Sequence, residues 1–126
     1  MAKVVSFTNK KGGVGKTTTV VNMAAYCADF GKRMLLIDLD SQGNATTGMG
    51  FSKSALKKSV YNVLIEDEKV SANILPTQIP LLDILPANVD LTGAEVELVY
   101  KRNRDRILKT ALEEGKDRYD YIFIDC

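Results

Sequence analysis

The sequence contains no histidine and only two cysteines, Cys27 and Cys126, which do not form a CxxC pair. Because zinc sites and histidine-based catalysis depend on these residue types, we expect neither within this chain. The formal net charge of +1 at pH 7 does not indicate a strongly basic nucleic-acid-binding protein, although a neutral total leaves room for a local basic patch. No apolar stretch approaches membrane-spanning length, and no charged leader precedes the first strand pattern. The sequence therefore predicts a cytoplasmic protein without membrane attachment.

The composition is that of an ordinary globular protein, with 45% hydrophobic and 26% charged residues. A chain of 126 residues is long enough for one domain with a core, and too short to favour two. We therefore expect residues 1–126 to belong to a single domain.

A glycine-rich loop, Asn9–Thr18, connects a short strand pattern that we expect to be buried, residues 3–8, to a helical pattern, residues 17–30. Backbone N–H groups in such a loop, together with the positive end of the following helix, bind phosphate. Lys16 can reach the outer phosphates of a nucleotide, and the Thr17 hydroxyl can ligate magnesium. The sequence thus predicts a nucleoside triphosphate site, held by Lys11, Gly12, Gly13, Val14, Gly15, Lys16, Thr17 and Thr18.

The loop departs from the usual motif Gly-x-x-x-x-Gly-Lys-Thr at its first position. Counting back from Lys16 places Lys10 where the first glycine is expected, and Lys11 follows it. A second cation close to Lys16 is electrostatically unfavourable, so Lys11 makes most sense if it faces phosphates that Lys16 does not neutralise. The alternative is that Lys10 and Lys11 are solvated loop charges.

Acidic residues end two further strand patterns. Asp38 and Asp40 follow the apolar run 33–37, and Asp125 ends the run 119–124. Residues 3–37 form a βαβ pattern, whose right-handed crossover makes its strands parallel. Since ligands bind at the carboxyl ends of parallel strands, the three acids should gather near the glycine loop, where they can hold magnesium or orient an attacking water. The alternative for Asp38 and Asp40 is that they only cap and turn the chain.

The middle of the chain predicts short elements. Ser59 can cap a short helix. Two apolar runs follow, of which 73–75 is limited by proline to an edge or a turn and 81–85 is the better strand. A capping box at 92–95 opens one helical stretch, and a second stretch closes at Gly115. The basic residues near position 105 are better explained as a solvated helix face than as a nucleic-acid surface, because no aromatic residue interleaves them.

Together these segments resemble the ParA/Soj family of partition ATPases, a deviant-Walker group that also contains MinD and the nitrogenase iron protein. The matching segments are Lys10–Thr18, Asp38–Thr46, Leu85–Asn88, Gly93–Glu95 and Tyr121–Cys126. The resemblance implies an α/β P-loop NTPase fold, with a mostly parallel sheet flanked by helices, and it implies ATP and Mg²⁺ as cofactors. Position 41 is serine where the family usually has proline, which loosens the turn after Asp40 but keeps both acids in register.

The resemblance also implies residue roles. Lys11 would reach across an ATP-bound homodimer to the partner's phosphates, and Lys16 would bind the phosphates of its own ATP. Asp40 would position the attacking water, so the catalytic residues would be Lys11, Lys16 and Asp40. On the metal side the resemblance implies Thr17 and Asp125, and the position of Asp38 at a strand end adds it as a further candidate for the metal.

Members of that family are much longer, and this chain corresponds to their N-terminal half. The absent C-terminal half would carry the adenine-recognition segment and a surface for non-specific DNA. The whole protein would be an ATPase that dimerises with ATP, associates with the nucleoid, and is stimulated by a ParB-like centromere-binding protein during chromosome or plasmid segregation. Without the other half, we expect the sheet to expose an edge and apolar area, so that the chain self-associates or is partly disordered.

Three other functions stay open. One is a MinD-like ATPase that positions cell division, although Gln42–Asn44 after the acids favours the partition branch. Another is cluster-based electron transfer, which would need further cysteines because Cys126 lies too close to the Asp125 strand. The last is a nucleotide-binding module without turnover.

Overall fold

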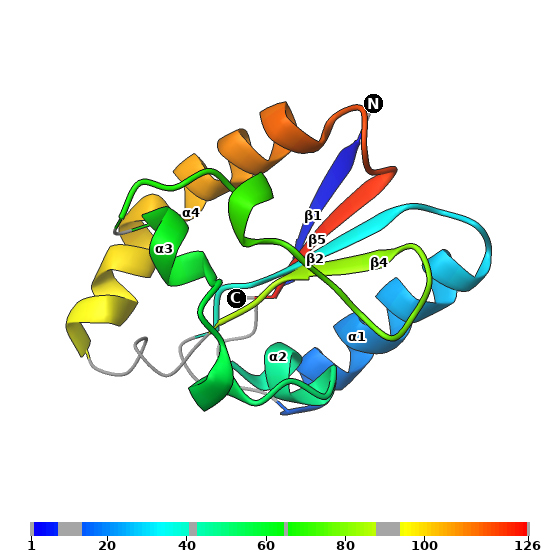
Figure 1. The fold of residues 1–126 in the computed structure, drawn as a ribbon, viewed down its shortest axis with the longest axis horizontal. Helices are drawn as coiled ribbons and strands as arrows, with labels where there is room; N and C mark the ends of the chain where they lie inside the picture. Colours follow the sequence, from blue (N-terminus) through cyan, green and yellow to red (C-terminus); the bar gives the residue numbers. More distant parts are fainter. Residues whose placement is uncertain (1, 8–13, 41–42, 65, 88–93, 126) are drawn as a thin grey trace.

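The computed structural model describes residues 2–7, 14–40, 43–64, 66–87 and 94–125. Its helices and strands are, in chain order, β1 (Lys3–Phe7), α1 (Val14–Asp29), β2 (Met34–Asp38), α2 (Asn44–Gly48), α3 (Val60–Leu64), β3 (Leu75–Pro76), β4 (Leu82–Leu85), α4 (Ala94–Gly115) and β5 (Tyr121–Asp125) (Figure 1). Short 3-10 turns occur at Lys53–Ala55 and Ser71–Asn73. None of the helices in these ranges is long and apolar enough to cross a membrane.

The strands of the described part of the chain form one sheet in the order β1-β5-β2-β4-β3. The pairs β1–β5, β5–β2 and β2–β4 are parallel, and the two-residue β3 is antiparallel to β4 at one edge. The short run that includes Pro76 is therefore an edge strand, as its proline predicts. The predicted fold class, a mostly parallel sheet flanked by helices, is confirmed.

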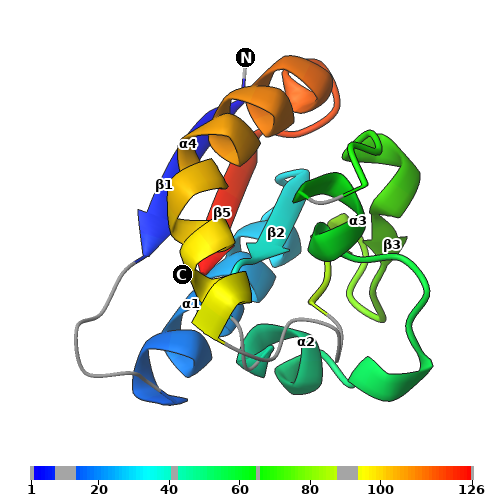
Figure 2. The ribbon, with the colours of Figure 1, turned by 90° about the vertical axis from the view of Figure 1, so that its left-hand side faces the viewer.

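Helices cover both faces of the sheet, with α3 and α4 on one side and α1 and α2 on the other (Figures 1 and 2). Successive side chains of a strand point to opposite faces. Strand β2 accordingly supplies Leu35 and Ile37 to the core under α3 and α4, and Met34 and Leu36 to the core under α1 and α2. All four side chains are fully buried.

Helix α1 packs through the small residues that the sequence predicts for its buried face. Val20, Ala24 and Ala28 are fully or nearly fully buried, whereas Cys27, which the sequence also predicts for this face, is only half-buried. Gly31 follows the helix with a φ of 85°, a left-handed conformation that favours glycine and ends the helix as predicted.

Helix α4 is one continuous helix of 22 residues, whereas the sequence pattern predicts two stretches. The pattern is wrong here because no proline or glycine interrupts residues 94–114. The Thr92–Gly93 part of the expected capping box lies outside the described residues.

The Ser59 hydroxyl does not cap α3, which corrects the sequence prediction. It is buried without a hydrogen-bond partner among the described residues. The first N–H of the helix, that of Val60, instead donates to the carbonyl oxygen of Pro86 at 2.7 Å. A tertiary acceptor therefore satisfies the first N–H of the helix.

Strand β1 is an exposed edge in the part of the chain that the structure describes, whereas the pattern predicts a buried strand. Its residues are all exposed or half-buried, while every residue of β2 is buried. The difference arises because β1 has a paired neighbour, β5, on one side only within the described residues. The side chain of Val5 is left 38% exposed. The expected sheet edge is thus present.

Candidate functional site

The carboxyl ends of β1, β5 and β2 lie side by side. Asp125 pairs in register with Phe7 on one side and with Asp38 on the other. The N–H of Leu39 also donates to the carbonyl oxygen of Asp125 at 2.8 Å. The sheet topology therefore brings the acids of two distant segments to one edge, as the parallel arrangement predicts.

The first turns of α1 place Lys16 and Thr17 on the carboxylate of Asp125. The Lys16 Nζ atom lies 2.7 Å from Oδ1 of Asp125, and the Thr17 hydroxyl donates to Oδ2 at 2.9 Å. Asp125 is fully buried and Thr17 is only 6% exposed. A buried carboxylate is stable there because a cation and a hydroxyl donor share its two oxygens.

The pair of Thr17 and Asp125 has the chemistry of a magnesium site. Hydroxyl and carboxylate oxygens are hard ligands of the kind that Mg²⁺ takes, and this ion usually completes its shell with phosphate oxygens and water. Oδ1 of Asp125 is buried with no partner beyond the Lys16 ion pair among the described residues. No group of three or more acidic, histidine or cysteine side chains that could hold a metal occurs in those residues. The two residues fit a Mg²⁺ that is also bound by a nucleotide.

Asp38 is held entirely by donors of its own chain. Its Oδ2 accepts hydrogen bonds from the backbone N–H of Thr46 at 2.9 Å and from the Thr46 hydroxyl at 2.6 Å, and its Oδ1 accepts one from the N–H of Asp40 at 3.1 Å. Burial raises the pKa of Asp38 to about 7, against the lowering effect of the Thr46 hydrogen bonds, and the charge of Asp125 adds to the rise. This geometry suits the alternative in which Asp38 turns the chain, and its metal role stays a prediction.

Asp40 lies at the surface of the same edge and is half-buried. The side-chain amide of Asn44, the first residue of α2, donates to its Oδ2 at 2.9 Å. The N–H of Gly43 donates to the carbonyl oxygen of Asp40 at 2.9 Å, and Gly43 has a φ of 64° that favours glycine. The turn thus holds Asp40 two residues after β2, and its water-positioning role stays a prediction.

Part of the predicted site lies outside the described residues. These are Lys11, Gly12 and Gly13, so the role of the additional lysine is not tested by the structure. Val14 and Gly15 open α1, and Thr18 is exposed in its first turns. Of the predicted residues, the structure brings together Lys16, Thr17 and Asp125, with Asp38 on the adjacent strand.

Asn44 and Thr46, which hold the two acids at the end of β2, have no role predicted from the sequence. The available signal is their position, four residues after Asp40 and eight after Asp38, in a segment that matches the ParA/Soj motif. Their hydrogen bonds depend on the fold of α2, which the sequence pattern does not predict.

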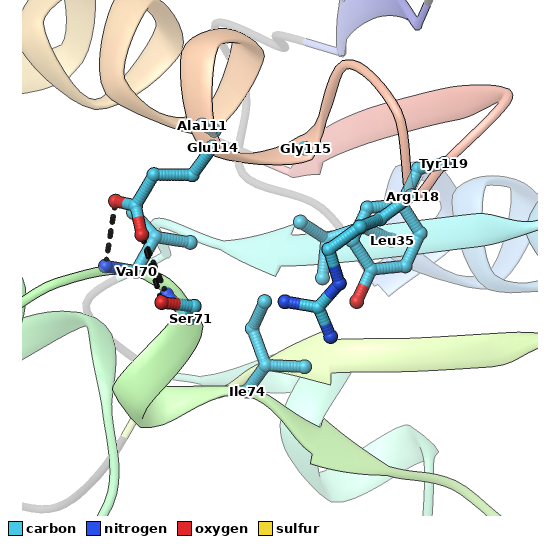
Figure 3. Close-up of a pocket in the computed structure, with 9 residues that line it drawn as sticks. All are labelled: Leu35, Val70, Ser71, Ile74, Ala111, Glu114, Gly115, Arg118 and Tyr119. Atoms are coloured by element: carbon cyan, nitrogen blue, oxygen red, sulfur yellow. Dashed lines mark hydrogen bonds between the residues drawn. The ribbon is translucent and has the colours of Figure 1, made fainter.

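A hollow away from these residues has no room for a ligand. It lies between α4 and the 3-10 turn at Ser71 (Figure 3), and its interior has a volume of about 0 Å³ for water-sized molecules. The Glu114 carboxylate fills this seam and accepts hydrogen bonds from the N–H groups of Val70 and Ser71 at 3.0 and 3.1 Å and from the Ser71 hydroxyl at 2.9 Å. The seam is a structural junction.

Comparisons with known sequences relate the chain to partition proteins. A family model described as an AAA domain matches residues 2–126. The chain is 51% identical over 126 residues to the sporulation initiation inhibitor protein Soj of Bacillus subtilis, with 100% of this chain and 50% of that protein covered. It is 44% identical over 126 residues to the chromosome partitioning protein ParA of Myxococcus xanthus, with 100% of this chain and 44% of that protein covered. The chain spans about half the length of these curated relatives.

Solved structures with the same fold carry nucleotides and magnesium. Cobyrinic acid a,c-diamide synthase from Mycobacterium smegmatis, with a bound ATP analog and magnesium, matches with a TM-score of 0.86 and 40% identity, covering 100% of this chain and 51% of that one. The septum site-determining protein MinD from Pyrococcus horikoshii, complexed with Mg-ADP, matches with a TM-score of 0.78 and 29% identity, covering 100% and 49%.

Proposed function

We propose that this chain, which belongs to the AAA domain family and to its ParA/Soj-type P-loop proteins, binds ATP and Mg²⁺ at the carboxyl ends of its parallel strands. The observation that carries the proposal is the shared contact of Lys16 and Thr17 with the buried Asp125 carboxylate. Such a cluster holds a phosphate-binding cation and a magnesium-binding hydroxyl in place before the nucleotide arrives. The nucleotide- and magnesium-bound structures of MinD and cobyrinic acid a,c-diamide synthase support the same choice of ligands.

The phosphate-side residue Lys16 and the metal-side residues Thr17 and Asp125 have different proposed roles. Lys16 exchanges its ion pair with Asp125 for the outer phosphates, while the glycine loop and the start of α1 direct N–H groups at them. Thr17 and Asp125 would hold Mg²⁺, directly or through water, and the bound ion would supply positive charge beside the phosphates. Asp40 orients the attacking water from the turn after β2, because its carboxylate is held there by Asn44.

The wider function that we propose is that of a partition ATPase in chromosome or plasmid segregation. Lys11 then completes the site of a second subunit in an ATP-dependent homodimer. The longer protein binds non-specific DNA through its C-terminal half, associates with the nucleoid in the cytoplasm, and is stimulated by a ParB-like centromere-binding protein. The similarity to Soj and ParA supports this choice.

The second candidate is a MinD-like ATPase that positions cell division, which the fold shared with the Pyrococcus horikoshii MinD favours. The higher identity of this chain to Soj and ParA, 51% and 44% against 29% to MinD, supports the partition function as the first candidate. A third candidate is nucleotide binding without turnover by this half-length chain.

Replacing Asp40 separates binding from turnover. In Asp40→Asn, we expect Mg-ATP affinity to stay within about threefold of wild type and the hydrolysis rate to fall by about a hundredfold, because the variant loses the carboxylate that orients the water but no phosphate contact. The measurements are a fluorescent-ATP titration and a phosphate-release assay.

The matched control is Asp29→Asn, which changes an exposed aspartate at the end of α1 and should leave both quantities unaltered. Hydrolysis by Asp40→Asn at the wild-type rate would exclude the proposed role of Asp40. Binding without turnover in the wild type would favour the binding-module candidate.

A further inference from the structure

One buried hydroxyl group joins three segments at the carboxyl edge of the sheet. Thr46 of α2 is fully buried. Its Oγ1 donates to Oδ2 of Asp38 at 2.6 Å and accepts from the N–H of Ala87, two residues after β4, at 2.9 Å. Its backbone N–H donates to the same Asp38 oxygen at 2.9 Å. Thr46 thus links α2 to the ends of both β2 and β4.

The direction of this hydrogen-bond chain is determined by its ends. A backbone N–H can only donate, so the Thr46 oxygen must accept from Ala87. The single hydroxyl proton is then available for Asp38, whose oxygens accept. Serine can reproduce this arrangement, and an apolar side chain of the same shape, such as valine, cannot.

The hydrogen-bond network continues from Asp38 to Asp40. Oδ1 of Asp38 accepts the N–H of Asp40 at 3.1 Å, and the Asp40 carboxylate accepts the Asn44 amide at 2.9 Å. The backbone of Asp40 is therefore held through Asp38, and its side chain is held through α2. Both of these supports meet at Thr46, which bonds to Asp38 and belongs to α2.

We propose that Thr46 is a positioning residue that fixes Asp40 for water attack by tying α2 to the β2 and β4 ends. This inference rests on the proposed function for its catalytic consequence only, because the hydrogen bonds that carry it do not involve a nucleotide. Thr46 does not touch the reacting atoms. Its effect reaches the site through Asp38 and Asn44.

The test compares Thr46→Val with Thr46→Ser. In Thr46→Val, we expect the hydrolysis rate to fall at least about tenfold, while Mg-ATP affinity stays within about twofold, because Asp40 loses its support and the phosphate-side residues keep theirs. Thr46→Ser should retain a rate within about threefold of wild type. A loss of stability alone would not separate rate from affinity in this way, nor would it be rescued by serine.

Amide hydrogen exchange supplies a readout that needs no turnover. The amides of Ala87 and Asp40 should be protected in the wild type and in Thr46→Ser, and both should exchange at least about tenfold faster in Thr46→Val. A wild type that fails to bind ATP would overturn the proposed function, and the exchange rates would still decide the positioning role.

Two results would overturn the inference. One is wild-type turnover together with unchanged Asp40 exchange in Thr46→Val. The other, which also decides the matter if Thr46→Val does not fold, is an unprotected Ala87 or Asp40 amide in the wild type.

Discussion

Asp125 is the residue that connects the phosphate side of the candidate site to its metal side. It accepts both the Lys16 ammonium and the Thr17 hydroxyl, so the phosphate side and the metal side meet on one buried carboxylate. The neighbouring acid, Asp38, is also fully buried, yet its oxygens are taken by Thr46 and by the N–H of Asp40. Two acids in register on adjacent strands thus have different surroundings and different chemistry.

The buried Asp38 makes the stability of the fold depend on pH. The pKa of Asp38 is about 7 in the folded chain, against an ordinary value of 3.8. Between these pH values the folded chain holds the Asp38 proton more tightly than the unfolded chain does. The stabilisation that Asp38 contributes is therefore fully present below about pH 4 and is lost as pH rises through about 7. We expect the free energy of unfolding to fall by about 2–4 kcal/mol across that interval.

Urea unfolding at a series of pH values measures this dependence. Other carboxylates titrate in the same interval, so the informative quantity is the difference between wild type and Asp38→Asn, which cannot ionise. That difference should follow the Asp38 titration. A difference that does not change with pH would contradict the assignment.

The sequence could place Asp38 and Asp125 at the carboxyl ends of parallel strands because both residues end apolar runs. It could not predict that Thr46 would occupy the oxygens of Asp38, since that contact requires α2 to fold back onto β2. For the same reason it left open whether Asp38 serves a metal or turns the chain.

At the element scale, Glu114 holds α4 against the segment that follows α3. Its carboxylate accepts three hydrogen bonds at the start of the 3-10 turn Ser71–Asn73, where free N–H groups favour an anion (Figure 3). This junction lies on the side of the sheet covered by α3 and α4, away from the N-terminal turns of α1. It should contribute to stability without contributing to nucleotide binding.

We expect Glu114→Ala to lower the free energy of unfolding by about 1–3 kcal/mol, because it leaves backbone donors without their acceptor. The exposed neighbour Glu113 supplies the control, and Glu113→Ala should change stability by less than about 0.5 kcal/mol. Urea unfolding measures both effects. Equal stabilities of the two variants would show that the junction has no energetic weight, and altered Mg-ATP affinity in Glu114→Ala would contradict its purely structural role.

The sequence could predict elements that have regular apolar spacing and a residue that ends them, such as glycine. It could not predict features that depend on tertiary partners. Apolar spacing and Gly31 sufficed for α1. The helix at Val60 was expected, but its first N–H bonds to Pro86, which no local pattern reveals. The position of β1 at an edge likewise depends on which strands are its neighbours.

Across the molecule, apolar side chains remain exposed on β1, on α1 and at the residue that follows α1. Val5 is 38% exposed, while Met23, Tyr26 and Phe30 are 43%, 65% and 69% exposed. The rings of Tyr26 and Phe30 lie 4.8 Å apart and form one apolar patch. Unpaired strand edges and such patches favour association with another chain.

We therefore expect the 126-residue chain to associate with further copies of itself through the β1 edge and the patch of Tyr26 and Phe30, or to be partly disordered. Sedimentation velocity over a range of concentrations measures association. Phe30→Lys should weaken it by about tenfold, because a charge replaces apolar area that would be buried. Leu112→Lys, at a residue that is 37% exposed on α4, is the control and should leave it unchanged. A fully ordered monomer at all concentrations would contradict this expectation.

Nucleotide binding at residues 9–18 is tested by titrating wild type and Lys16→Ala with a fluorescent ATP analogue in the presence of Mg²⁺. We expect Lys16→Ala to bind at least about tenfold more weakly, because a charge-assisted contact to the phosphates is lost. Lys32→Ala, which removes an exposed lysine just after α1, should bind like wild type. Equal affinities of wild type and folded Lys16→Ala would contradict the assignment of residues 9–18 as a phosphate-binding loop.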